Sequence, residues 1–279
     1  MIQFKDVSFE YKNDQADLSR LALDHISLEI REGEFVTIMG RNGSGKSTFA
    51  RCMNALFIPT SGDVLIDGMS TSNRDDIIDI RRKVGMVFQN PDNQIVSTTV
   101  EREIAFGLEN LGVDTNVMHE VVEASLHRFR LEHYRKHPPH LLSGGEKQRL
   151  ALASVMAMNP KYIIFDEPTA MLDPISQREL LNILYEIKKD NSHKKTTDQI
   201  TIILITQFPE ETLKSDRLII LNKGNIAYDD KPGFVFQNIN EIRELGLEVP
   251  IEFEVKKMLV EHKGYTSEEL NLIFPDHDE

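Results

Sequence analysis

The most chemically informative stretch of the sequence is a glycine-rich loop that ends in a lysine and two hydroxyl side chains. It reads GRNGSGKST from Gly40 to Thr48 and satisfies the pattern G-x-x-x-x-G-K-[ST] in full. Its glycines allow backbone N–H groups to close around an anion, and a following helix adds its positive amino end. Lys46 is placed to reach the β- and γ-phosphates of a nucleotide, and Ser47 to offer its hydroxyl to Mg²⁺. The predicted phosphate-loop contacts are Gly40, Asn42, Gly43, Ser44, Gly45, Lys46, Ser47 and Thr48.

Two adjacent carboxylates, Asp166 and Glu167, follow the apolar run YIIF at 162–165. If that run is a strand of a parallel sheet, both side chains lie at the carboxyl edge, where such folds bind ligands. Asp166 can then hold Mg²⁺ directly or through a water, and Glu167 can orient and deprotonate an attacking water. Two acids after a strand also occur as simple solubilising charge. The functional interpretation therefore depends on their pairing with the phosphate loop.

A second stretch suited to anions is LSGGEKQR, from Leu142 to Arg149. It opens a helical pattern, so the hydroxyl of Ser143 and the backbone N–H groups of Gly144 and Gly145 stand at a helix amino end. Taken alone, the stretch is also typical of a helix cap with a Gly-Gly hinge. Together with the phosphate loop about a hundred residues earlier, it predicts a composite pocket built from two phosphate-type sites.

Short apolar runs must position these motifs. The runs 35–39, 84–88, 162–165 and 202–205 are almost continuously apolar, which suits parallel strands that are covered on both faces. The stretches 2–11 and 23–30 alternate instead, which indicates half-exposed antiparallel strands. The segment 91–157 contains three helical patterns and is interpreted as a helical insertion. A hairpin is predicted at Lys223-Gly224, followed by mixed short helices.

The chain is accordingly divided into a main domain, 1–222, which holds the insertion 91–157, and a C-terminal extension, 223–279. From Asn225 onward there are thirteen acidic against five basic residues, which is more than half of the net charge of −13. A charged tail of this kind is usually a solvated face. A surface for a dimer or partner contact is the sharper alternative.

Composition excludes several classes of protein. At 279 residues and 40% hydrophobic content the chain can bury a sizeable core. No apolar run approaches the ~18–20 residues of a membrane-spanning helix, and the start MIQFKDVSFEY lacks the features of a signal peptide. We expect a cytosolic chain whose membrane role comes through a partner. Cys52 is the only cysteine, which excludes an intrachain disulfide, and the net charge of −13 disfavours binding to nucleic acid.

The motifs GRNGSGKST, VFQN, LSGGEKQR and IIFDEPTAMLD occur in an order that resembles the ATP-binding subunits of ABC transporters over roughly residues 2–230. The resemblance implies an α/β fold of the P-loop ABC ATPase type, with a parallel core sheet, an N-terminal antiparallel β subdomain, a helical insertion and a small C-terminal α/β extension. It implies ATP and Mg²⁺ as ligands. In this family two domains dimerise head to tail, so Ser143, Gly144 and Gly145 are expected to serve the partner's nucleotide.

The resemblance also implies roles for single residues. Tyr11 matches the aromatic residue on which adenine stacks, although a core tyrosine at a strand end would look the same. Gln89 matches the glutamine that touches Mg²⁺ and the attacking water, on a loop that moves with the transmembrane partner. Asp173 matches the loop that crosses the dimer interface. Glu146 stands where a glutamine is commoner, which leaves the Ser-Gly-Gly core intact.

Within the family, FQNPDNQI, AMLDP and the segment GLEVPIEFEVKKMLVEHKGY resemble the energy-coupling factor branch, and the first of its two ATPases. Such complexes drive uptake of vitamins and metal ions. They pair two ATPases with a transmembrane coupling protein and an exchangeable substrate-binding membrane protein. The resemblance therefore implies a peripheral location on the cytoplasmic face of the cell membrane, and a groove after Gln89 for the coupling protein's helices.

A second departure from the family pattern concerns catalysis. A histidine normally follows the last core strand and donates to the γ-phosphate, but here the strand ends in Thr206-Gln207. None of the nine histidines follows another predicted strand, and the nearest, His193, lies in a polar stretch. A glutamine amide can still donate a hydrogen bond but cannot become cationic. We expect Gln207 to weaken hydrolysis at this site without abolishing it.

Two other functions use the same pocket. A soluble ABC ATPase of DNA repair or translation is one, but such chains generally carry two ATPase units or a long coiled-coil insertion, and neither occurs in this sequence. A regulatory nucleotide-binding subunit with negligible catalysis is the other. The intact Glu167 argues against that alternative, whereas Gln207 keeps it open.

Overall fold

The computed structural model describes residues 1–11, 20–192 and 199–263, and the centre of this part is a six-stranded sheet. Its strands are, in spatial order, β10 (Asn225–Asp230), β9 (Arg217–Asn222), β3 (Phe35–Met39), β8 (Thr201–Thr206), β7 (Tyr162–Asp166) and β6 (Val84–Val87). All except β10 run parallel. The parallel core sheet predicted from the apolar runs is therefore confirmed.

The core strands are apolar throughout because both faces of the sheet are covered. Alternate residues of β7 enter two different hydrophobic clusters: Tyr162 and Ile164 pack on one side, Ile163 and Phe165 on the other. All five residues of β7 are buried. A strand in this position gains stability from both faces, at roughly 25 cal/mol for each Å² of apolar surface removed from water.

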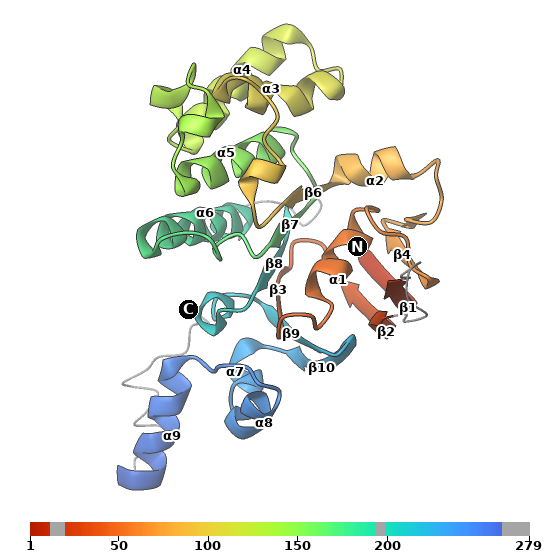
Figure 1. The fold of residues 1–279 in the computed structure, drawn as a ribbon, viewed down its shortest axis with the longest axis vertical. Coiled ribbons are helices and arrows are strands. Elements are labelled where there is room, and N and C mark those ends of the chain that lie inside the picture. Colours follow the sequence, from red (N-terminus) through yellow and green to blue (C-terminus); the bar gives the residue numbers. More distant parts are fainter. Residues whose placement is uncertain (12–19, 193–198, 264–279) are drawn as a thin grey trace.

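A four-stranded antiparallel sheet, in the order β2-β1-β4-β5, lies beside the core (Figure 1). Its strands are β1 (Ile2–Tyr11), β2 (Arg20–Ile30), β4 (Ser61–Ile66) and β5 (Met69–Ser70). The antiparallel pairing of β1 with β2 is as predicted, but β2 begins three residues before the expected start at Leu23. Helix α1 (Lys46–Met53) packs between the two sheets and shares a core with both.

Helices cover the other face of the core sheet (Figure 1). Between β6 and β7 the chain forms α3 (Val100–Asn110), α4 (Thr115–Arg128) and α5 (Gly144–Ala157), with short 3₁₀ turns at Pro91–Asn93, Glu132–Tyr134 and Pro139–Leu141. Thr99 and Asp114 cap α3 and α4 by accepting backbone N–H groups. Helix α6 (Pro174–Ser192) follows β7, and the shorter α2 (Ile77–Lys83) precedes β6.

The C-terminal part continues the core sheet before it turns helical. Strands β9 and β10 form a hairpin in which Lys223 and Gly224 both have positive φ, 50° and 84°, as a tight two-residue turn requires. The expected domain boundary after residue 222 falls inside this hairpin. Three helices follow, α7 (Pro232–Val235), α8 (Ile239–Glu244) and α9 (Ile251–Lys263). The remainder of the extension, 264–279, and His193 lie outside the described residues.

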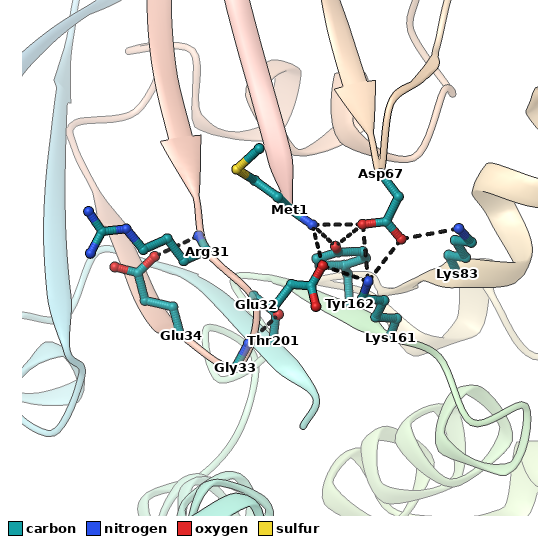
Figure 2. A network of polar contacts seen from close by, with 10 residues as sticks. All are labelled: Met1, Arg31, Glu32, Gly33, Glu34, Asp67, Lys83, Lys161, Tyr162 and Thr201. Carbon is teal, nitrogen blue, oxygen red and sulfur yellow. Dashed lines mark hydrogen bonds and ion pairs between the residues drawn. The ribbon is translucent and has the colours of Figure 1, made fainter. Parts of the chain in front are cut away.

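A polar network joins the two sheets at the amino edge of the parallel strands (Figure 2). The carboxylate of Asp67, which follows β4, is its centre and is surrounded by donors. These donors are the amino group of Met1, Lys83, Lys161 and the Tyr162 hydroxyl. Lys161 also donates to Glu32, at 2.7 Å. Burial alone would raise the pKa of Asp67, but these donors together hold the pKa well below its usual range.

Candidate functional site

A cavity of about 560 Å³ opens at the carboxyl edge of the parallel strands. It brings together most of the residues predicted for nucleotide binding and catalysis, from five segments of the chain. Its lining residues are Tyr11, Arg20, Ala22, Asn42, Gly43, Gly45, Lys46, Ser47, Thr48, Gln89, Glu167 and Gln207. Parallel strands place their carboxyl ends at one edge, which is why residues so distant in sequence meet there.

The phosphate loop connects β3 to α1 and depends on glycine at particular positions. A Cβ atom at Gly40 would lie 2.4 Å from the carbonyl oxygen of Leu221. Gly45 has a φ of 109°, and a Cβ there would lie 2.4 Å from the carbonyl oxygen of Ala22. Side chains are excluded from both positions, so the backbone stays close to the cavity and helix α1 can begin at Lys46.

Lys46 is held at the mouth of this loop, with only 4% of the residue exposed. Its ammonium donates to the carbonyl oxygens of Gly40 and Arg41, at 2.8 and 3.2 Å, and lies 3.3 Å from a carboxylate oxygen of Glu167. The buried hydroxyl of Ser44, in the same loop, has no hydrogen-bond partner among the described residues and is not part of the cavity lining. The loop therefore presents a nearly buried positive charge to an anion.

Asp166 and Ser47 form an oxygen-rich pair beside the loop. The hydroxyl of Ser47 donates to Asp166 at 3.0 Å, and Asp166 is 5% exposed. Burial raises the pKa of Asp166, and the bond from Ser47 partly opposes that shift. Hydroxyl, carboxylate and amide oxygens are hard ligands of the kind that Mg²⁺ takes. The residues present thus fit a magnesium ion, with the side chain of Gln89 as a further oxygen donor on the cavity wall.

Glu167 stands directly after β7 in the left-handed conformation, with a φ of 51°. That conformation is uncommon for a glutamate, and backbone strain of this kind is often found at functional sites. The amide of Gln89 donates weakly to Glu167, at 3.4 Å. Gln207 follows β8, the neighbour of β7, and is an exposed residue on the same cavity wall. Thr206 fixes the start of this turn because its hydroxyl donates to the buried Glu211, at 2.6 Å.

Comparisons with known proteins agree with this geometry. The profile of the family described as ABC transporter matches residues 23–170. The energy-coupling factor transporter ATP-binding protein EcfA1 of Clostridium perfringens is 45% identical over 92% of this chain and 90% of that protein. The EcfA1 protein of Bacillus subtilis is 41% identical over 98% and 92%.

The chain belongs to the ABC transporter family, in its energy-coupling factor branch. It is the ATP-binding and ATP-hydrolysing subunit of such a transporter.

Solved structures show the same fold. CbiO1 from Clostridium perfringens, described as part of the ABC transporter complex CbiONQ, superimposes with a TM-score of 0.73 and 32% identity, covering 92% of this chain and 98% of that one. The ATP-binding cassette MJ0796, in a dimeric post-hydrolysis state with ADP and Pi, gives a TM-score of 0.73 and 30% identity, covering 83% and 99%. Among the described residues of this ABC subunit, no helix is long and apolar enough to cross a membrane.

The ABC signature lies away from the cavity formed by the same chain. Ser143, Gly144, Gly145 and Asp173 are absent from the residues that line it. Ser143 caps α5 in a reciprocal arrangement with Glu146, whose carboxylate accepts from the Ser143 hydroxyl at 2.8 Å. Asp173 begins α6 by accepting the N–H groups of Ile175 and Ser176.

Tyr11 lines the cavity at the end of β1, and the residue is 41% exposed. Its hydroxyl lies 2.9 Å from that of Thr48, so the ring is anchored to α1. Two further lining residues, Arg20 and Ala22, were not predicted from the sequence. Arg20 donates to the carbonyl oxygen of Gly43 at 3.2 Å. No motif marked it, since it stands at the first position of a strand whose start was placed three residues later.

Proposed function

We propose that the chain binds MgATP in the 560 Å³ cavity. Lys46 and the backbone of Gly40–Thr48 bind the phosphates. The other residues of this phosphate-binding loop are Asn42, Gly43, Ser44, Gly45 and Thr48. Ser47, Asp166 and Gln89 hold Mg²⁺. When bound, Mg²⁺ would neutralise charge on the β- and γ-phosphates. Tyr11 offers its ring to the adenine.

Glu167 is proposed as the general base that orients and deprotonates the attacking water. In the structure its carboxylate is engaged by Lys46, at 3.3 Å, and by Gln89, at 3.4 Å. Phosphates are stronger partners for Lys46 than a single carboxylate. Binding of the nucleotide would therefore draw the ammonium away and leave Glu167 free to accept a proton. This contact between Lys46 and Glu167 is the observation that carries the proposal.

We further propose that Ser143, Gly144, Gly145 and Asp173 act on the nucleotide of a second, non-identical ATPase. Support comes from their position, since none of them lines the cavity of their own chain. The dimeric structure of MJ0796 is compatible with two cassettes sharing their sites. Gln207 then weakens one of the two sites, because its amide cannot provide the charge of an imidazolium.

The transporter would place this subunit on the cytoplasmic face of the cell membrane, next to a transmembrane coupling protein and a substrate-binding membrane protein. CbiO1, which has the same fold, is part of the ABC transporter complex CbiONQ, and this supports such an assembly. Residues 1–222 would form the ATPase domain, with 91–157 receiving the coupling protein. Residues 223–279 would form an extension for a dimer or partner contact. Vitamins or other micronutrients are the proposed cargo.

Purification of the tagged chain from membranes tests the assembly. We expect a second ATPase of comparable length and two membrane proteins in the eluate, together with ATP hydrolysis that exceeds that of the isolated chain. Recovery of the chain alone, or with ribosomal or DNA-repair components, would contradict the proposal. Recovery with membrane proteins but no second ATPase would contradict the heterodimer alone.

A further inference from the structure

A second cavity, of about 330 Å³, lies between the helical segment and the ATPase core. The end of α4, the middle of α5, the outer face of α6 and the turn after the 3₁₀ segment Pro209–Thr212 form its walls. It shares no lining residue with the nucleotide cavity. Its lining includes Arg128, Arg130, Arg149, Glu179, Tyr185 and Lys214.

The walls of this cavity carry an excess of positive charge, although the chain as a whole is acidic at −13. Three arginines and two lysines line it, against two glutamates. A concave site with one sign of charge concentrates the field and attracts counter-ions.

The three arginines of this cavity differ in whether a carboxylate pairs with them. Arg149 forms an ion pair with Glu179 at 2.8 Å, and Arg128 forms one with Asp190 at 3.0 Å. Arg130 is exposed and has no ion pair or hydrogen bond from its side chain within the described residues. Two of the three arginines are thus held in place by carboxylates, and the third is open.

A buried donor also points to an acceptor that the protein does not supply. Arg149 is only 15% exposed, and its buried Nε–H has no hydrogen-bond partner among the described residues. Buried polar groups are nearly always satisfied. Glu179 accepts from Nη1 of this guanidinium, so the Nε–H is a further donor that suits an oxygen of a bound anion.

Tyr185 and Lys214 also line the cavity. The ammonium of Lys214 lies 4.3 Å from the centre of the Tyr185 ring. This contact holds the ammonium beside the ring without neutralising its charge. Lys214 and Arg130 come from segments far apart in the sequence, so one ligand that contacts both would link the core to the helical segment.

We infer that this cavity is a binding site for a compact anion that carries two or more phosphate groups. Arginine forks match phosphate oxygens in pairs, and the volume is in the range of small-ligand pockets. The site is connected to the catalytic residues through the chain. Helix α5, which holds Arg149, begins at Gly144, and Lys214 follows Gln207 by seven residues. Occupancy would therefore bridge the helical segment and the core.

Titration of the full chain with inorganic tripolyphosphate tests the inference by calorimetry, with Mg²⁺ in excess and the nucleotide cavity saturated by a non-hydrolysable ATP analogue. We expect one tripolyphosphate per chain, with binding that weakens as salt is added. The double variant Arg130→Gln/Lys214→Gln should bind at least about tenfold more weakly. Lys136→Gln, an exposed lysine of the same helical segment outside the cavity, should bind as the parent does.

Two further arms separate the sources of the signal. The same titration on a Lys46→Ala background should still show binding, which distinguishes this cavity from the phosphate loop. Vesicles of anionic phospholipid, compared with neutral vesicles, test whether the phosphates are those of a lipid headgroup. Binding of either probe that depends on Arg130 and Lys214 supports the site. Absence of binding to both probes, or equal affinity in the double variant, would overturn it.

Discussion

Carboxylates lie near both ends of strand β7, and the two ends differ in how many partners the protein gives them. At the amino end, the Asp67 carboxylate accepts from Lys83, Lys161 and the Tyr162 hydroxyl (Figure 2). At the carboxyl end, the Glu167 carboxylate has one ion pair and one long hydrogen bond among the described residues. One end is satisfied by the protein, whereas the other is the end at which we propose that the nucleotide binds.

The difference shows how one sheet can combine stability with catalysis. The network around Asp67 is partly buried, and it rigidifies the fold because removing any member leaves another charge with fewer partners. Incomplete satisfaction costs stability, and at β7 it occurs at the edge where the nucleotide is proposed to bind. The strand between the two ends is buried on both faces and keeps them apart.

The largest expected effect comes from the carboxyl end. Glu167→Gln removes the proposed general base while keeping the shape of the side chain. Hydrolysis at this site should fall by about 10²- to 10⁴-fold, with ATP still bound, as measured by single-turnover hydrolysis in the complex with its partner. Glu120→Gln, at an exposed position of α4, is the matched control. Undiminished single-turnover hydrolysis in Glu167→Gln would remove this residue from the mechanism.

The next effect concerns the amino end. Asp67→Asn should lower the free energy of unfolding by about 2–3 kcal/mol, because charge-assisted hydrogen bonds from several donors are lost together. Urea unfolding measures this loss, and ATP affinity should stay unchanged. Asp79→Asn breaks the exposed pair with Arg82 and should cost under about 0.5 kcal/mol. Equal losses in the two variants would mean that the network adds no stability.

The same variant has a defined dependence on pH. Asp67 has a pKa below its ordinary value in the folded chain, so its contribution is complete above the pKa of the unfolded chain and is lost as the pH falls. The difference in unfolding free energy between the parent and Asp67→Asn should therefore shrink from about pH 5 towards about pH 2. A constant difference over that range would exclude the ionised carboxylate as its source.

The two ends also differ in how far the sequence could predict them. The residues at the carboxyl end belong to contiguous motifs that each follow one apolar run. Nucleotide-site roles for Lys46, Asp166 and Glu167 could therefore be predicted before the fold was known. The amino end assembles Met1, Asp67 and Lys161 from separate segments. No periodicity or motif links those positions, and only the packing of the two sheets brings them together.

Some features of the carboxyl end could not be predicted from the sequence. Arg20 lines the cavity, but its strand was expected to begin later, and an arginine before an alternating run carries no signal of its own. The hairpin at Lys223-Gly224 was predicted, whereas the continuation of the core sheet into β10 was not. Turn residues specify a turn locally, but they do not say which sheet the second strand will extend.

A smaller effect is expected from a substitution in the phosphate loop. Ser44→Ala removes a buried hydroxyl that has no partner among the described residues, so the free energy of unfolding should change by less than about 1 kcal/mol. The proposed contact of Ser44 with the phosphates predicts that ATP affinity falls by roughly three- to tenfold. Ser154→Ala is the matched control, because that hydroxyl donates to Ala151 at 3.0 Å. It should lose stability and keep ATP affinity. The reverse pattern would show that the Ser44 hydroxyl serves the fold.

The smallest expected effect is the gain from Gln207→His. Hydrogen bonds that involve a charged group exceed neutral ones by about 1 kcal/mol, which corresponds to roughly a fivefold faster step. ATP hydrolysis by the complex should therefore rise about fivefold, and more at pH 6 than at pH 8, because only the protonated imidazole provides the extra charge. Gln237→His, at an exposed position in the extension, controls for an added histidine. An unchanged rate at both pH values would mean that Gln207 does not limit this site, and the proposed asymmetry would have to arise in the partner ATPase.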